Sequence, residues 1–111
     1  MRSQNNDAPL VVPDAFQQAR LSLPREIVII ATWADDQSNE ITIQDFRRDG
    51  DSFIAIFSDE DAFDRDLAGT PFADSGVVIK TDLFLSMMHG GELLILDAGS
   101  PSPKEIHLPK R

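Results

Sequence analysis

Short apolar runs separated by polar turns predict a chain of small elements, beginning with a helix. Pro13 and Asp14 suit a first helical turn, because proline tolerates that position and a carboxylate is favoured near the partial positive charge of a helix N-terminus. Pro24 is expected to end this helix. The next run, residues 27–31, is continuously apolar and rich in β-branched side chains, which predicts a strand buried on both faces.

Two further strands complete a predicted meander. Residues 41–46 alternate between apolar and polar positions, as a half-buried strand does. Asp49 and Gly50 form a hairpin signal, and the apolar run 53–57 is expected to be the returning strand. The polar segment 35–39 is expected to form the turn between the first two strands.

A capped acidic helix is predicted directly after the third strand. Ser58 is expected to be its N-cap, with Asp61 as the reciprocal acid of a capping box. Phe63 and Leu67 lie four residues apart and give the helix a narrow apolar stripe. Gly69 is placed to end the helix, because glycine readily adopts the left-handed conformation found after helix C-termini.

The last third of the chain predicts a strand, a helix and two more strands. Residues 77–80 form the first strand, and Thr81 is expected to cap a helix over residues 82–89. Residues 93–96 indicate a buried strand, and residues 104–108 alternate like an edge strand. We therefore predict an α+β fold, a mixed sheet with an N-terminal three-stranded meander and short helices packed on it.

The length favours a single domain. A chain of 111 residues, 41% of them apolar, can bury one core but not two. Residues 1–10 are mostly polar and lack periodicity, so we expect a flexible N-terminal tail there and the domain over residues 11–111. The longest apolar run is too short for a membrane-spanning helix.

Charge narrows the classes of partner. Nineteen acidic residues face ten basic ones, so the net charge is −9, which repels nucleic acid and anionic lipid. Basic residues cluster only in short groups without interleaved aromatic residues, namely Arg47, Arg48, Lys104, Lys110 and Arg111. We therefore expect no nucleic acid and no membrane as partner, whereas a protein partner, for example a basic one, is compatible with this charge.

The absence of cysteine removes several chemistries. Disulfides, thiolate catalysis, iron–sulfur clusters and cysteine-based zinc sites are all excluded. The N-terminal segment has one basic residue but no apolar stretch, so we do not expect it to act as a secretory signal. A cytoplasmic location is the simplest expectation.

The densest charge lies in the acidic helix. Two interpretations are a divalent-cation site or an acid–base pair on one hand, and helix capping with a solvated face on the other. A calcium loop needs ligands spaced along a loop with a sharp glycine turn, and this stretch is helical, so capping is favoured. The acids concerned are Asp59, Glu60, Asp61, Asp64 and Asp66.

The two histidines, His89 and His107, are the remaining candidates for chemistry. A metal pair would need both imidazoles to converge on an acid, and a hydrolase could use either as its base. No Gly-x-Ser-x-Gly motif accompanies them. Gly90 and Gly91 follow a predicted helix, so they end it rather than cradle a phosphate. We expect no catalytic residue, no cofactor and no metal site.

Aromatic and methionine side chains supply most of the bulk for the core. Such stripes are usually core, but a domain this small cannot hide every apolar side chain, so a partner-binding groove is the alternative. The candidate partner-binding residues are Trp33, Phe84, Met87 and Met88.

The second half of the chain resembles a known family. A strand ending in phenylalanine leads directly into a capped acidic helix over residues 54–63, followed by a strand at 77–80 and a short helix at 83–89. The strand at 93–96 then ends in a turn at 97–100. This order, over about half the chain, resembles the N-terminal domain of the bacterial SseB family. An Asp-Ala step stands where that family has an Asn-Pro step.

The resemblance implies an α+β fold and no established catalytic residues. We therefore expect a non-enzymatic bacterial interaction or regulatory domain with a protein partner. Two alternatives stay open, a regulatory domain with a small-ligand pocket between Trp33 and the late helices, and a hydrolase using His89 or His107. The uncovered edge at 104–108 makes a weak homodimer a further expectation.

Overall fold

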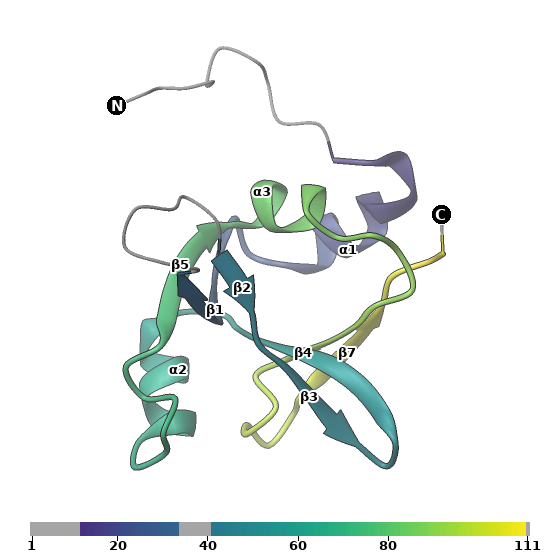
Figure 1. The fold of residues 1–111 in the computed structure, drawn as a ribbon. Helices are drawn as coiled ribbons and strands as arrows, with labels where there is room; N and C mark the ends of the chain where they lie inside the picture. Colours follow the sequence, from purple (N-terminus) through teal and green to yellow (C-terminus); the bar gives the residue numbers. More distant parts are fainter. Residues whose placement is uncertain (1–11, 34–40, 111) are drawn as a thin grey trace.

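One long strand, β1 (Glu26–Trp33), organises a seven-stranded mixed sheet (Figure 1). The computed structural model describes residues 12–33 and 41–110, apart from the side chain of Trp33. Strand β1 pairs antiparallel with β2 (Ile41–Ile43), β4 (Asp51–Phe57) and β5 (Gly76–Lys80). Residues 27–31 are all buried, which confirms the prediction of a strand covered on both faces.

The second predicted strand is present but divided by a bend. Its first half, β2, pairs with β1, and its second half, β3 (Asp45–Arg48), pairs with β4. Between them, the backbone N–H of Gln44 donates to the carbonyl of Ile30. The hairpin between β3 and β4 turns at Asp49 and Gly50, whose φ angles of 54° and 88° give the predicted two-residue turn.

The C-terminal strands make the sheet mixed. Strand β6 (Leu93–Leu96) lies parallel to β4, and β7 (Lys104–His107) lies antiparallel to β6. Strand β7 is at the end of the strand order, so the predicted edge strand is confirmed. The fold is α+β, as the alternation of elements predicted.

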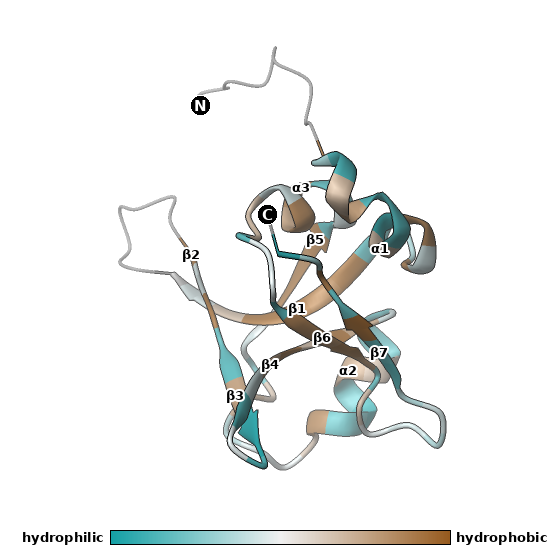
Figure 2. Ribbon diagram, turned by 90° about the vertical axis from the view of Figure 1, so that its right-hand side faces the viewer, coloured by the Kyte–Doolittle hydropathy of each residue, from teal (hydrophilic) through white to brown (hydrophobic). Residues whose placement is uncertain are grey.

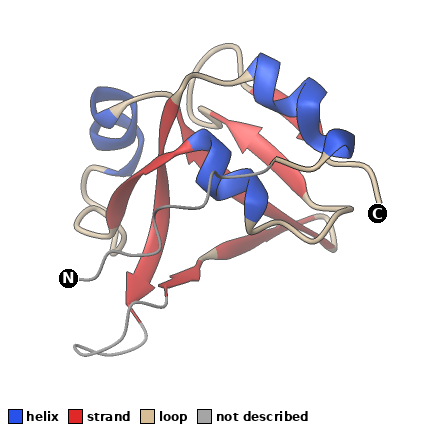
Figure 3. Cartoon of the chain, turned by 90° about the horizontal axis from the view of Figure 1, so that it is seen from above, coloured by secondary structure: helices blue, strands red, loops and turns tan. Residues whose placement is uncertain are grey.

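Helices cover both faces of the sheet (Figures 1 and 3). A 3-10 turn at Asp14–Phe16 leads into α1 (Gln17–Ser22), which packs with α3 (Thr81–Ser86) on one face. Helix α2 (Glu60–Leu67) covers part of the other. Side chains of β1 therefore alternate between two apolar clusters, and Figure 2 shows β1 and β6 as markedly apolar ribbons.

The N-cap of α2 differs from the prediction. Asp59, not Ser58, is the cap, and its Oδ1 accepts a hydrogen bond from the N–H of Ala62 at 2.8 Å. The hydroxyl and the N–H of Ser58 both donate to the carboxylate of Asp97 instead. The prediction of a capping box with Asp61 was therefore wrong, because Ser58 is hydrogen-bonded to Asp97 at the end of β6 and the helix begins one residue later.

The helix after β5 also differs at both ends. Thr81 is its first residue rather than its cap, and its buried hydroxyl donates to the carbonyl of Pro24. The helix ends at Ser86 rather than at His89, because the carboxylate of Glu92 accepts the N–H groups of residues 89 and 90. The predicted tail at 1–10 and turn at 35–39 lie outside the described residues.

Candidate functional site

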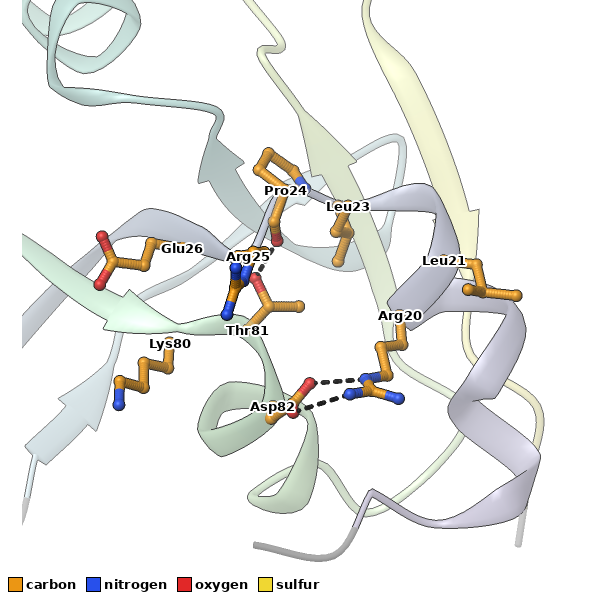
Figure 4. A pocket seen from close by; sticks show the side chains of 9 residues that line it. All are labelled: Arg20, Leu21, Leu23, Pro24, Arg25, Glu26, Lys80, Thr81 and Asp82. Atoms are coloured by element: carbon orange, nitrogen blue, oxygen red, sulfur yellow. Dashed lines mark hydrogen bonds and ion pairs between the residues drawn. The ribbon is translucent and has the colours of Figure 1, made fainter.

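Helix α1 and the loop that follows it are fastened to the start of α3 by three polar contacts (Figure 4). Thr81 donates its backbone N–H to the carbonyl of Arg25 at 2.9 Å and its hydroxyl to the carbonyl of Pro24. Arg20 of α1 forms a two-point ion pair with Asp82 of α3, at 2.8 Å from Nε to Oδ1 and 3.1 Å from Nη2 to Oδ2. These contacts fix the walls of a surface pocket.

That pocket, which we name the basic pocket, has a volume of about 670 Å³. Three basic and two acidic side chains line it, a local charge of +1 on a chain whose net charge is −9. Arg25 and Lys80 form no ion pair with any other described residue. Figure 4 shows the lining residues, which are Arg20, Leu21, Leu23, Pro24, Arg25, Glu26, Lys80, Thr81 and Asp82.

A smaller depression of about 230 Å³, the acidic groove, lies beside the first turn of α2. Val78 pairs with Val28, and paired residues of neighbouring strands share a face, so Val78 lies on the α2 face of the sheet. Helix α2 leaves it 49% exposed. The other lining residues are Glu26, Ile27, Ser58, Asp59 and Glu60.

The acidic groove is lined by three carboxylates and by no basic side chain of the described residues. Glu26, Asp59 and Glu60 take part in no ion pair within the described part of the chain. Asp59 accepts a helix-capping hydrogen bond, which leaves its negative charge in place. The groove is therefore an apolar floor under a negative rim.

The two depressions meet at Glu26, which lines both. Glu26 of β1 stands opposite Lys80 of β5 in the pairing register. Val78 and Lys80 are two residues apart on the same strand face, a separation of about 7 Å. The surface therefore changes from negative to positive charge over the length of two residues.

A family model for the SseB protein N-terminal domain matches residues 3–110. The chain belongs to this family. The match covers nearly the whole chain, well beyond the half in which the sequence resemblance was apparent, and includes both depressions of this SseB-family domain. No curated protein and no solved structure matches it. Among the described residues, no helix combines the length and the apolar character needed to cross a membrane.

The candidate partner-binding residues occupy different places in this SseB-family domain. Phe84 is fully buried and Met88 is 5% exposed, so both belong to the core and offer almost no surface to a partner. Met87 is half-buried against the same core, and the side chain of Trp33 lies outside the description. Phe84 is buried because it lies on the face of α3 that packs on the core, whereas Leu83, the residue before it, is exposed.

The capping interpretation holds for the acidic residues at the start of α2. Asp59 caps α2, and Glu60 and Asp61 occupy the first turn, near the positive end of the helix dipole. Asp66 departs from a solvated face, because its side chain is only 7% exposed and lies against the backbone of Gly99. No three His, Asp or Glu side chains of residues 12–33 and 41–110 are grouped to hold a metal ion.

Neither histidine lines either depression. His107 is on β7 with its side chain 74% exposed, and its Nε2 lies 3.7 Å from Oε1 of Glu105. His89 is exposed in the loop after α3.

Sequence reasoning named Ser58, Asp59 and Glu60 only as parts of the acidic helix, and it missed the strand residues that line these depressions with them. Three apolar residues follow one another at positions 77–79, so the pattern carries no signal that the middle one, Val78, is exposed. The face shared by Glu26 and Lys80 depends on the pairing of two strands about fifty residues apart, which periodicity does not reveal.

Proposed function

We propose that this SseB-family domain is a non-enzymatic interaction module that binds a basic, partly apolar segment of a partner protein in the acidic groove. The observation that carries the proposal is Val78, 49% exposed in a groove that the carboxylates of Glu26, Asp59 and Glu60 also line. A single exposed apolar residue is ordinary, but one that shares a groove with three carboxylates is complementary to a basic segment with an apolar side chain.

The charge of the whole chain supports the same partner. A net charge of −9 attracts a basic protein over a distance of about one Debye length, roughly 8 Å at physiological salt. The groove then supplies the short-range contacts, because burying Val78 removes apolar surface from water and the carboxylates can accept charge-assisted hydrogen bonds.

The chemistry of the depressions supports a role without catalysis. They offer carboxylates, guanidinium and ammonium groups and aliphatic side chains, which are groups that recognise a partner. The two imidazoles, the side chains best suited to proton transfer near neutral pH, lie outside both.

Affinity capture with matched variants tests the proposal. Wild-type domain, Glu60→Lys and Val78→Ser serve as baits in extract from cells that express the protein. Asp61→Lys is the matched control, because it reverses a charge in the same helical turn without lining the groove. We expect a basic protein to be retained by the wild type and by Asp61→Lys, and to be lost with the other two.

Two results would contradict the proposal. One is that proteins captured by the wild type are retained equally by Glu60→Lys and Val78→Ser. The other is that Asp61→Lys loses them to the same degree, because binding would then follow net charge and not the groove. Far-ultraviolet circular dichroism of each bait confirms that the variants remain folded.

A further inference from the structure

We infer that the basic pocket is a second binding site, one that takes a carboxylate group attached to a short aliphatic chain. This inference goes beyond the proposed function and does not depend on it, because the residues that would bind the carboxylate, Arg25 and Lys80, do not line the acidic groove.

Available positive charge is the first argument. Arg20 is already engaged with Asp82 through two hydrogen bonds, whereas Arg25 and Lys80 have no acidic partner among the described residues. Figure 4 shows both side chains at the pocket, Arg25 from the loop just before β1 and Lys80 from the end of β5. A guanidinium and an ammonium group can together donate several hydrogen bonds to one anion.

The net charge of the lining selects the kind of anion. Glu26 and Asp82 also line the pocket, so the local charge is only +1. A carboxylate, with one negative charge, balances this lining. A phosphate carries more than one charge near neutral pH and would be repelled by the two carboxylates already present.

Apolar surface beside the cations selects the rest of the ligand. Leu21 is 78% exposed, the highest exposure among the large apolar side chains described, and it lines the pocket with Leu23 and Pro24. A ligand of three to six carbon atoms attached to the carboxylate would cover this surface while its charge meets Arg25.

The pocket is organised before the ligand arrives. The hydrogen bonds of Thr81 to the carbonyls of Pro24 and Arg25 hold the loop, and the ion pair of Arg20 with Asp82 holds α1 against α3. Binding therefore requires the ordering of only two flexible side chains, those of Arg25 and Lys80. A volume of about 670 Å³ is in the range of small-molecule sites.

Two sources present the same chemistry, a free aliphatic carboxylate and a glutamate side chain next to a leucine in a protein. Nuclear magnetic resonance titrations of ¹⁵N-labelled domain distinguish them, with hexanoate as one probe and acetyl-Leu-Glu-Leu-amide as the other. Acetate, hexanol and inorganic phosphate are the controls for the aliphatic chain, the charge and the kind of anion.

We expect saturable shifts of the Leu21, Arg25 and Thr81 amide resonances with at least one of the two carboxylate probes. Hexanoate alone would indicate a free carboxylate, and the peptide alone a protein side chain. Arg25→Gln should weaken binding about tenfold, since a hydrogen bond to a charged group is lost. Arg47→Gln is the matched control, because it removes an exposed arginine charge on β3, outside the pocket, and should leave the affinity unchanged.

Three results would overturn the inference: no saturable shift with either carboxylate probe, equal affinity of Arg25→Gln and wild type, or phosphate binding as tightly as hexanoate. Arg25 and Lys80 are exposed, so their variants should remain folded, and resonances outside the pocket verify this in the same spectra. Val78→Ser and Glu60→Lys should bind hexanoate like the wild type, which separates this result from the test of the acidic groove.

Discussion

The carboxylate of Asp97 accepts both hydrogen bonds that Ser58 donates, from the hydroxyl at 2.8 Å and from the backbone N–H at 3.0 Å. Ser58 follows β4 and Asp97 follows β6, and these two strands are parallel neighbours. The backbone N–H of Asp97 in turn donates to the carbonyl of Ile56. One side chain therefore joins two strand ends at the point where α2 begins.

Asp97→Ala should lower the free energy of unfolding by about 1–3 kcal/mol, because the N–H and hydroxyl of Ser58 lose their acceptor. Asp97 also has a φ of 54°, a conformation that alanine adopts less readily. Urea denaturation measures the effect. Asp97→Asn, which tolerates this φ and keeps one carbonyl oxygen, should lose less, and an unchanged midpoint for Asp97→Ala would refute the role.

Asp59→Ala should destabilise the domain by about 0.5–2 kcal/mol through loss of the α2 cap. Hydrogen exchange gives a local measurement, because the amide of Ala62 donates the hydrogen bond that the side chain of Asp59 accepts. Exchange at this amide should rise in Asp59→Ala and stay near the wild-type rate in Asp59→Asn and Ser58→Ala. If exchange at the Ala62 amide rose only in Ser58→Ala, Ser58 and not Asp59 would be the N-cap.

Gly76→Ala should cost about 1–3 kcal/mol, because an added β-carbon would lie 2.9 Å from the ring of Phe63. Replacing the ring with the smaller side chain of leucine relieves the contact. The double variant Gly76→Ala with Phe63→Leu should therefore lose less free energy of unfolding than the two single variants lose together. Thermal unfolding of the four proteins measures the coupling. Additive losses would show that the close approach has no energetic consequence.

The ion pair between Arg20 and Asp82 should contribute little to stability. Its side chains are 47% and 36% exposed, and pairs with that exposure typically contribute about 0.2–1 kcal/mol. A double-mutant cycle with Arg20→Ala and Asp82→Ala should give a coupling in this range that shrinks at high salt. A coupling that is large and independent of salt would contradict this.

Self-association through β7 remains a prediction. The strand pairs with β6 on one side, and Lys104 and Glu105 place charges on it, which oppose edge pairing. We expect a weak dimer whose fraction grows with protein concentration. Light scattering at two salt concentrations measures the mass, and a monomer under every condition would reject the dimer.

Local chemistry was sufficient to predict most elements. The β-branched run in β1 and the Asp49-Gly50 turn have strong local preferences, and the structure confirms both. The cap of α2 could not be predicted in the same way, because Ser58 and Asp59 are adjacent and both are good caps. The choice depends on Asp97, thirty-nine positions after Ser58.

The two depressions were even harder to predict from the sequence than the cap of α2. Arg25 and Lys80 carry no local signal of their proximity, which arises only when β1 pairs with β5. Phe84 and Met88 show the opposite difficulty, because a large apolar side chain has the same pattern in a core and in an interface. Burial depends on what packs against the helix, and a single sequence does not contain that information directly.

The parallel pairing of β4 with β6 has a consequence for the order of events during synthesis. Ile54 of β4 pairs with Leu94 of β6, which is synthesised forty residues later, so this edge of β4 has no partner strand until then. A nascent chain that has emerged only through α2 contains β1 to β4 but lacks β5, which pairs with β1, and β6, which pairs with β4. The sheet therefore cannot be completed until β5 and β6 have been synthesised, and the apolar side chains of β1 and β4 lack these neighbours until then.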